Sequence, residues 1–467
     1  MVMNDYKMTP QELRATWGLG AVFSLRMLGM FMVLPVLTTY GMALQGASES
    51  LIGLAIGIYG LMQAIFQIPF GLLSDRIGRK PLIVGGLLVF MIGSVIAAMS
   101  QSIWGIILGR ALQGSGAIAA AVMALLSDLT REQNRTKAMA FIGVSFGITF
   151  AIAMVAGPIV THAYGLQALF WGIALLALAA IAITLLMVPP APNHVLNRDS
   201  AIVRGSVHKV LANSRLLKLN FGIMCLHILL MSSFVALPRG MEQAGLPPQQ
   251  HWKVYLATML VSFAAVVPFI IYAEVKRRMR QVFAGCVLTL LAAELVLWGA
   301  GARLWTMIAG IQLFFVAFNV MEALLPSLIS KESPAGYKGT AMGIYSTTQF
   351  IGVAIGGSLG GWLFELQGAG LVFLAGALLA AVWFLVALTM PEPPWLSSLR
   401  VILPEQAVRD SGLQQKIAAC RGVAEAVVIA EERCAYVKID NQQTSRRELE
   451  QWLQTRAKQA GPENVLS

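Results

Sequence analysis

The chain has 467 residues, of which 57% are hydrophobic and only 12% are charged, and its mean hydropathy is +0.71. A water-soluble globular protein carries about twice this share of charged residues, so the composition excludes that class and predicts an integral membrane protein. The formal charge of +11 does not indicate a nucleic-acid partner, because Lys and Arg concentrate in alternate loops between apolar runs.

Apolar runs that are each long enough to cross a bilayer recur along the chain. We predict twelve transmembrane helices, at roughly 17–40, 51–73, 82–99, 103–126, 138–160, 166–188, 217–237, 254–275, 282–299, 304–329, 340–364 and 371–390. Positive residues gather in every second loop. By the positive-inside rule these loops and both termini are expected to be cytoplasmic.

The two halves of the chain repeat each other. A shift of 199 residues places Pro268 on Pro69 and Glu274 on Asp75. Parallel repeats of six helices are typical of two-lobed transporters, whose substrate site lies between the lobes near the membrane midplane. We therefore expect a short N-terminal segment, two six-helix lobes and a polar cytoplasmic linker between the lobes, at 1–15, 16–188, 216–391 and 189–215.

A soluble domain is expected after the last apolar run. A Pro-rich linker at 392–398 precedes residues 399–460, where strand-like alternation and helical segments follow in the order βαββα. This order predicts a small cytoplasmic α+β domain of the ferredoxin-like type. It resembles metal-carrier domains of that fold but lacks their C-x-x-C loop, so we do not predict copper binding there, and we expect no cofactor.

The stretch Gly71–Lys80, GLLSDRIGRK, separates the second and third apolar runs. Its charged residues cannot lie in hydrocarbon, so we predict a tight turn on one membrane face, with glycines that permit close backbone approach or a positive φ. Asp75 could accept hydrogen bonds from a helix N-terminus or pair with an arginine. A loop that only fixes topology is the alternative, but charge bias alone requires neither glycines nor an aspartate.

This stretch resembles the signature of loop 2–3 in the major facilitator superfamily. The matching residues are Gly71, Asp75, Arg76, Gly78, Arg79 and Lys80. The resemblance implies a conformational latch, in which Asp75 interacts with the N-terminal end of the eleventh span, near Thr340, when the central cavity opens outward.

A second motif runs from Arg110 to Ala117 in the fourth span and resembles the superfamily pattern R-x-x-Q-G-x-G-A. An arginine inside an apolar helix costs several kcal/mol unless it is paired or hydrated. By the resemblance Arg110 would face the central cavity and assist proton or substrate coupling. The alternative is an arginine whose head reaches back to the membrane interface.

A third motif lies in the fifth span, where Gly157-Pro158 matches the core of a signature carried by the antiporters of this superfamily. The pair can bend the helix. The flanking glycines of that signature are replaced by Ala153, Thr161 and His162, so symport or uniport remains open.

Isolated ionisable residues lie within other apolar runs and are candidates for proton coupling: Glu322, His227 and Arg26, beside Arg110. Burial in hydrocarbon favours the neutral form of a carboxyl group, so Glu322 is a candidate proton carrier. A structural pairing of Glu322 with an arginine or a hydroxyl is the alternative. Glu294 in the ninth span is less attractive, since the resemblance places that span at the rim of the bundle.

Neutral polar side chains could line the substrate cavity. The candidates are Tyr59, Gln63, Gln113, Gln312, Asn319, Tyr345 and Gln349, with Gln67 beside them. Taken singly, each is more often an interhelical hydrogen bond than a ligand.

As a whole the chain resembles the drug:proton antiporter branch of the major facilitator superfamily. The resemblance implies a bacterial inner-membrane transporter that exports small amphipathic molecules in exchange for protons by rocker-switch alternating access. A transporter-like sensor that signals through the C-terminal domain is the rival. We expect no enzymatic activity and a monomer whose partners are substrate, protons and lipid, with ion binding, ligand binding or self-association at the C-terminal domain.

Overall fold

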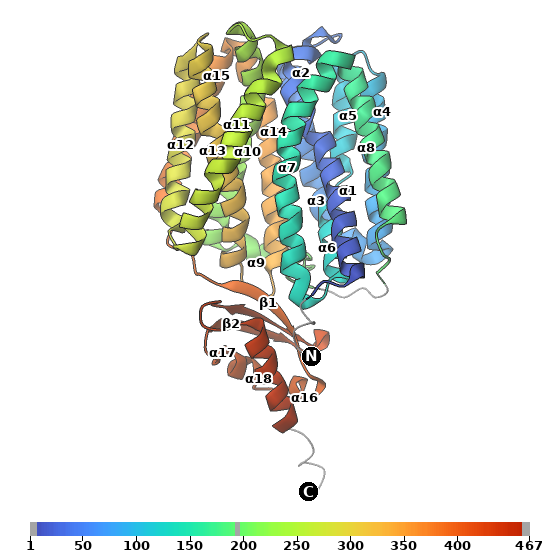
Figure 1. The fold of residues 1–467 in the computed structure, drawn as a ribbon, viewed down its shortest axis with the longest axis vertical. Helices are drawn as coiled ribbons and strands as arrows, with labels where there is room; N and C mark the ends of the chain where they lie inside the picture. Colours follow the sequence, from blue (N-terminus) through green and yellow to red (C-terminus); the bar gives the residue numbers. More distant parts are fainter. Residues whose placement is uncertain (1–6, 192–196, 460–467) are drawn as a thin grey trace.

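The computed structural model describes residues 7–191 and 197–459, so residues 1–6, residues 192–196 of the predicted linker and residues 460–467 lie outside the described part of the chain. Long helices form an upright bundle, and a small α+β domain hangs from one end of it (Figure 1). We call the end that carries this domain the proximal end and the opposite end the distal end.

The first half of the bundle comprises α1 (Pro10–Phe31), α2 (Leu34–Tyr40), η1 (Gly41–Ala43), α3 (Glu49–Ile77), α4 (Arg79–Met99), α5 (Ile103–Ser115), α6 (Ala119–Leu129), α7 (Glu132–Tyr164) and α8 (Leu166–Leu186). The linker contains α9 (Val207–Leu211). The second half comprises α10 (Ser214–Gln243), η2 (Pro248–Gln250), α11 (His251–Ile270), the π-helical turn η3 (Ile271–Val275), α12 (Met279–Ala300), α13 (Leu304–Glu332), α14 (Lys338–Gln367) and α15 (Ala369–Leu388).

Within the described residues, eleven segments are long and apolar enough to cross a membrane. The glycine-rich and hydroxyl-rich α14 is outside that count, yet it has 30 residues and packs within the same bundle. The predicted number of spans therefore agrees with the structure to within one helix.

Among the described residues, the first and fourth spans are each broken into two α-helices, which the sequence did not predict. The first span breaks between α1 and α2, where Pro35 opens the second piece. The fourth breaks between α5 and α6 at Gly116, whose backbone lies so close to α4 that an added Cβ would be 2.3 Å from the carbonyl oxygen of Gly86. A bundle can tolerate such breaks where neighbouring helices satisfy the freed backbone groups.

Glycines join the two halves at the distal end. A Cβ added at Gly53 of α3 would lie 2.4 Å from the carbonyl oxygen of Gly357 of α14, and one at Gly361 would lie 2.6 Å from the carbonyl oxygen of Glu49. Further contacts between the halves at this end are Thr38 Oγ1 donating to the Phe234 carbonyl (3.0 Å) and Ser50 N donating to Glu365 (3.1 Å). The two halves thus meet at the distal end through close backbone packing of α3 against α14 and through side-chain hydrogen bonds.

We expect Gly53→Val to open the distal end, since the new side chain collides with the backbone of α14. Overpacking of this kind should shift the ratio of distal-closed to distal-open molecules by roughly tenfold or more. Spin labels at Tyr164 and Trp305, which are both exposed, would report the change as a longer distance. Gly143→Val on α7 is the matched control, because nothing lies within 4 Å of its added Cβ.

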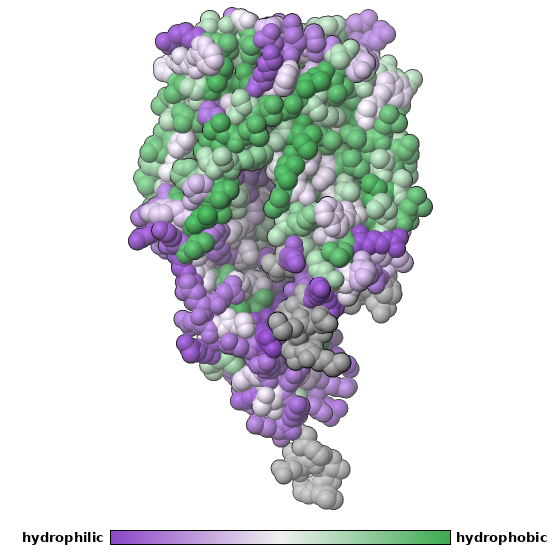
Figure 2. Space-filling model, in the orientation of Figure 1, coloured by the Kyte–Doolittle hydropathy of each residue, from purple (hydrophilic) through white to green (hydrophobic). Residues whose placement is uncertain are grey.

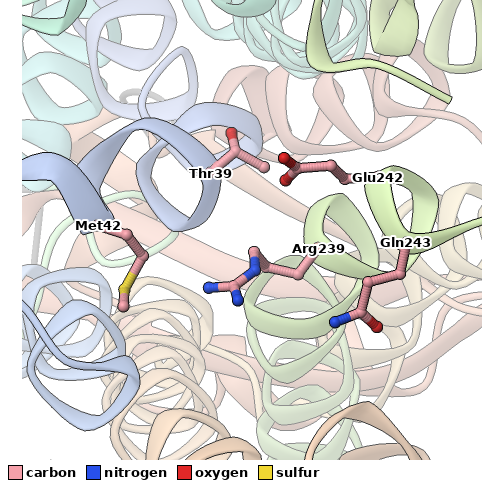
Figure 3. Close-up of a pocket in the computed structure, with 5 residues that line it drawn as sticks. All are labelled: Thr39, Met42, Arg239, Glu242 and Gln243. Carbon is pink, nitrogen blue, oxygen red and sulfur yellow. The ribbon is translucent and has the colours of Figure 1, made fainter. Parts of the chain in front are cut away.

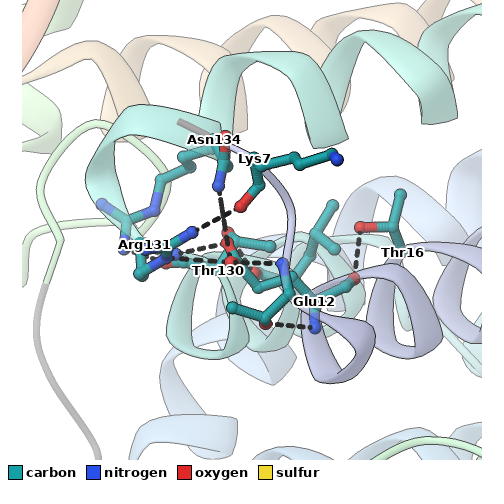
Figure 4. Close-up of polar contacts among 9 residues, drawn as sticks. Lys7, Glu12, Thr16, Thr130, Arg131 and Asn134 are labelled. Atoms are coloured by element: carbon teal, nitrogen blue, oxygen red, sulfur yellow. Dashed lines mark hydrogen bonds and ion pairs between the residues drawn. The ribbon is translucent and has the colours of Figure 1, made fainter. Parts of the chain in front are cut away.

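At the proximal end, α1 is tied to the start of α7. Glu12 is 3% exposed and accepts hydrogen bonds from the backbone and side chain of Arg131 (3.1 and 2.9 Å) and from Asn134 (3.2 Å). Glu12 also closes a capping box with Thr9 at the first turn of α1. Figure 4 shows these contacts converging on the carboxylate. The first helix begins at Pro10, before the predicted start of the first span at residue 17.

The C-terminal domain contains β1 (Ser397–Ile402), α16 (Glu405–Val408), α17 (Leu413–Ala418), β2 (Val423–Ile429), η4 (Ala430–Glu432), β3 (Cys434–Ile439) and α18 (Arg446–Gln459). Its sheet has the order β1-β3-β2 with both pairings antiparallel, in register from Ser397 opposite Ile439 to Ile402 opposite Cys434. The short helix α16 is an addition to the predicted order, and β1 begins two residues earlier than predicted.

Both faces of β3 are buried. Ala435, Val437 and Ile439 join the apolar core of the domain, which α17 and α18 complete. Tyr436 and Lys438 point the other way, where Tyr436 contacts Arg198 of the linker and Lys438 contacts Ser333 just beyond α13. This alternation explains why a lysine stands in an otherwise apolar strand.

Figure 2 shows a broad apolar belt around the bundle and a predominantly hydrophilic C-terminal domain. Between the two halves, on the proximal side of the belt, the surface is hollowed and less apolar residues are visible in the hollow. The distribution is that expected of a membrane core with one domain in water.

Candidate functional site

The signature stretch is more helical than predicted. α3 continues through Ile77, and the turn is reduced to Gly78, whose φ of 99° requires glycine. Asp75 therefore lies in the last turn of α3 and pairs with Arg79 at the start of α4. The exposed Arg76 lies beside Asp75 in that turn.

Arg79 is the centre of this ion-pair network. It is 6% exposed and also donates to Ser74 Oγ (2.6 Å) and Asp128 Oδ2 (3.3 Å). Lys80 donates to the carbonyl oxygen of Val188 at the end of the first lobe. Asp128 was not among the predicted residues, because a partner 49 positions away leaves no spacing signal in a single sequence.

The N-terminal end of α14, the expected partner of Asp75, is bonded to the linker. Gly339 N donates to the Arg198 carbonyl (2.9 Å), and Thr340 Oγ1 accepts from Val203 N (3.0 Å). The linker thus occupies backbone and side-chain groups that the latch would require.

Two buried arginines organise the polar interior of the first half. Arg26 donates to Gln63 Oε1 (3.0 Å) and to the Gly116 carbonyl (2.7 Å), and Gln63 donates to Gln67. Arg110 donates to the Ala55 carbonyl (3.2 Å) and to Gln113 Oε1 (3.1 Å). Both guanidinium groups are 1% exposed, so neither reaches the membrane interface.

Tyr59 lies between these arginines. The Arg110 guanidinium carbon is 4.8 Å from the centre of the Tyr59 ring, and that of Arg26 is 5.9 Å away. Gln113 closes the network by donating to Ser94 Oγ of α4 (2.9 Å). The aromatic ring and the carbonyl oxygens stabilise the two positive charges.

The predicted ionisable residues of the second half meet each other. Glu322 Oε1 of α13 lies 3.2 Å from His227 Nε2 of α10, and Gln349 Nε2 of α14 lies 3.0 Å from the same ring nitrogen. His227 Nδ1 lies 3.2 Å from the Ile223 carbonyl, which can only accept, so that nitrogen carries a proton. Among the described residues Glu322 Oε1 makes no hydrogen bond, so the 3.2 Å contact is a close approach, and a hydrogen bond across it would need a proton on either Nε2 or the carboxyl oxygen.

Other cavity candidates are placed differently. Gln312 donates to the Thr258 carbonyl and Ser262 Oγ of α11 (both 3.1 Å), and Asn319 donates to the Phe315 carbonyl of its own helix (2.8 Å). Neither residue contacts the His227–Glu322 pair through these bonds. Tyr345 is buried, and among the described residues its hydroxyl has no hydrogen-bond partner; the same holds for Tyr59.

Gly157 and Pro158 lie within α7. A Cβ added at Gly157 would be 2.3 Å from the carbonyl oxygen of Met32, so this motif packs against the break between α1 and α2. Glu294 is 1% exposed rather than at the rim, and its carboxylate fills the space beside Gly376 of α15 and accepts from Ser233 (3.4 Å). α12 itself lies at the edge of the bundle (Figure 1), but it turns Glu294 inward toward α10 and α15, so the expected rim position of this side chain was wrong.

A pocket of about 400 Å³ lies at the distal end between the halves. Figure 3 shows Thr39 and Met42 from the first half facing Arg239, Glu242 and Gln243 of α10. Arg239 also lies 3.8 Å from Glu49. This pocket lies outside the predicted set of cavity residues.

The C-terminal domain is docked through Lys438, which is 2% exposed. Its ammonium group donates to three carbonyl oxygens at the end of α13 and just beyond, on Ser330 (3.3 Å), Lys331 and Ser333. A cation at a helix C-terminus is favoured by the exposed carbonyls and the helix dipole. Burial nevertheless lowers the pKa of Lys438 to about 8.

We expect docking of the domain to strengthen as pH rises above about 8. The Lys438 pKa is below its ordinary value of 10.5, so between these values the undocked, solvated lysine binds more protons than the docked one. The gain between pH 7.5 and 9.5 should be about 2 kcal/mol. Hydrogen exchange of the β3 amides, corrected for intrinsic rates, measures it, and Lys438→Met should remove the pH dependence. Equal pH dependence in this variant would contradict the assignment.

Known proteins place the chain in a family. The crystal structure of a D-xylose-proton symporter superposes with a TM-score of 0.65 at 15% identity, covering 82% of this chain and 97% of that one, which shows the fold. Residues 19–356 match the Major Facilitator Superfamily model, and residues 399–455 match the YajR YAM domain.

Two curated relatives extend the match along the chain. The chain is 24% identical over 373 residues to the multidrug resistance protein MdtH of Yersinia enterocolitica, covering 79% of this chain and 86% of that protein. It is 72% identical over 452 residues to the inner membrane transport protein YajR of Escherichia coli, covering 96% of this chain and 99% of that protein. The chain therefore belongs to the major facilitator superfamily, as a multi-pass inner-membrane transporter of small molecules with a C-terminal YAM domain.

Proposed function

We propose that this transporter couples the export of small amphipathic molecules to proton entry by alternating access. The proximal end is cytoplasmic in this proposal, since the positive loops and the hydrophilic domain lie there. Closure of the distal, periplasmic end by the glycine contacts of α3 and α14 then makes the present structure an inward-facing state. Similarity to MdtH, which is named a multidrug resistance protein, supports the export direction.

The observation that carries the proposal is the His227–Glu322 contact at 3.2 Å. In one arrangement a protonated Glu322 donates to neutral His227, and in the other an imidazolium donates to the carboxylate. One proton is shared in both cases. Adding a second proton makes the pair cationic, whereas removing the shared proton makes it anionic if His227 stays neutral, so the pair can change charge as the lobes rock.

The substrate would bind beside this pair, between the lobes. Tyr59 of α3 and Tyr345 of α14 each have a buried hydroxyl that lacks a partner within the described residues, which costs free energy until water or a substrate satisfies it. The hydrogen bond of Gln349 to His227 would change when His227 gains or loses a proton. The other side of the cavity would carry the fixed positive charges of Arg26 and Arg110, which Gln63 and Gln113 hydrogen-bond. Gln312 and Asn319 would have a structural role, as hydrogen-bond donors to α11 and to their own helix.

Structural motifs complete the proposed cycle. Gly157 and Pro158 would let α7 pivot on the break in the first span, and the stretch Gly71–Lys80 would latch the cytoplasmic side when the cavity faces outward. The lobes at 16–188 and 216–391 would move as two bodies. The strand order β1-β3-β2 supports a ferredoxin-like C-terminal domain.

Proteoliposomes with an internal pH dye provide the test. An imposed pH gradient should drive uptake or release of a cationic amphipathic probe, and the probe should in turn move protons. Probe binding without flux would favour the sensor hypothesis instead. Parallel movement of probe and protons would replace antiport by symport.

A further inference from the structure

A short piece of the interlobe linker lies between α3 and α14 on the cytoplasmic side. Ile202 is 7% exposed. Its Cδ1 atom would be 3.5 Å from a Cβ added at Gly71 of α3 and 2.9 Å from one added at Gly343 of α14. Gly71 belongs to the first lobe and Gly343 to the second, so this side chain separates the lobes at the level of the signature stretch.

The backbone of the same linker segment occupies the start of α14. A Cβ added at Gly339 would lie 2.3 Å from the carbonyl oxygen of Ala201. Thr340 Oγ1 is bonded to Val203 N at 3.0 Å and lies 3.1 Å from Ser206 Oγ. Together these contacts cover the end of the helix that the loop 2–3 latch would have to reach.

The C-terminal domain holds this segment in place. Tyr436 Oη of β3 accepts a hydrogen bond from Arg198 N (2.9 Å), and Glu432 Oε1 accepts one from Arg198 Nε (3.1 Å). Glu425 of β2 accepts from Ala335 N (3.3 Å) in the turn that joins α13 to α14. The C-terminal domain therefore binds both the linker and the turn that joins α13 to α14.

We propose that residues 198–206 form a wedge that keeps the cytoplasmic side open, and that the C-terminal domain sets the conformational balance by holding this wedge. The proposal rests on the proposed alternating-access function. For the cytoplasmic side to close, Ile202 must leave the space between Gly71 and Gly343, and the linker must release the start of α14. Each contact of the C-terminal domain with Arg198 opposes that release.

Distances across the cytoplasmic side test the wedge. Spin labels at Ile77 and Val275, which are 50% and 72% exposed, are introduced into the full chain with its four cysteines replaced, and double electron–electron resonance is recorded without substrate or gradient. Ile202→Ala should raise the ratio of molecules with a closed cytoplasmic side to molecules with an open one by about tenfold or more. The Ile202 side chain is packed between the lobes only in the open state, so its truncation destabilises that state alone. Leu211→Ala, at an exposed position of the same linker, is the matched control.

Tyr436→Phe provides a second, milder variant, because it removes only the hydroxyl that accepts from Arg198. It should shift the ratio in the same direction by a few-fold. If the wild type shows both a short and a long label distance, and neither variant changes the ratio of the two populations, the wedge is overturned and alternating access still holds. A single distance under every pH and substrate condition would overturn alternating access as well.

Discussion

Glu322→Gln is expected to reduce proton-coupled flux to the level of protein-free liposomes while leaving substrate exchange intact. Gln imitates a carboxyl group that is always protonated, so position 322 no longer changes charge with pH and the pair loses its anionic state. The lobes can still rock in the neutral state. Coupled transport needs a site that gains and loses a proton in step with that motion.

The measurement compares two modes in the same vesicles. Uptake driven by a pH gradient should vanish in Glu322→Gln, whereas exchange of labelled for unlabelled probe at equal pH should continue. Glu392→Gln, which removes an exposed carboxylate outside the bundle, is the control and should behave as the wild type. Gradient-driven uptake that survives Glu322→Gln would refute the assignment of the proton site.

His227 offers an independent check on the shared proton. His227→Asn removes the ring nitrogen that lies 3.2 Å from Glu322 Oε1 and leaves the carboxyl group alone among neutral neighbours. Deprotonation then produces an uncompensated charge, so the pH at which coupled flux is half-maximal should move upward. An unchanged pH profile would indicate that the two residues titrate independently.

The sequence carried enough information to predict the membrane bundle, its twofold repeat and the identities of the buried ionisable residues. Hydropathy and charge report directly on the solvent around each segment, and Arg26, Arg110, His227 and Glu322 stand out because ions are costly in hydrocarbon. The contact between His227 and Glu322 could not be predicted from hydropathy or charge. His227 and Glu322 come from different helices, and nothing in their spacing specifies which faces meet.

The breaks at Pro35 and Gly116 and the burial of Glu294 were missed for a related reason. Each depends on a neighbour that is distant in the chain, such as the Gly86 carbonyl beside Gly116. The position of Ile202 depends most clearly on distant neighbours. From the sequence, Ile202 belongs to a polar linker between the lobes, and only the tertiary structure places it between two glycines of opposite lobes.

Asp75→Asn should lower coupled transport by roughly tenfold while leaving membrane insertion and thermal stability near those of the wild type. A charge-assisted hydrogen bond or helix-dipole contact is worth about 1–2 kcal/mol, which corresponds to about a tenfold change in the population of the latched state. In the present inward-facing state the substitution should destabilise the protein only slightly, because Arg79 keeps its hydrogen bond to Asp128 at 3.3 Å.

The latch hypothesis differs from a purely structural role in what it predicts for conformation. If Asp75 binds the start of α14 only when the cytoplasmic side is closed, Asp75→Asn should deplete that state and lengthen the distance between labels at Ile77 and Val275. Ile202→Ala acts in the opposite direction, so the double variant should lie between the two. Asp410→Asn, which breaks a 2.7 Å ion pair with Lys416 on the C-terminal domain, controls for loss of a carboxylate and should change neither transport nor distance. Normal turnover in Asp75→Asn would leave the ion-pair network at Arg79 with a structural role only.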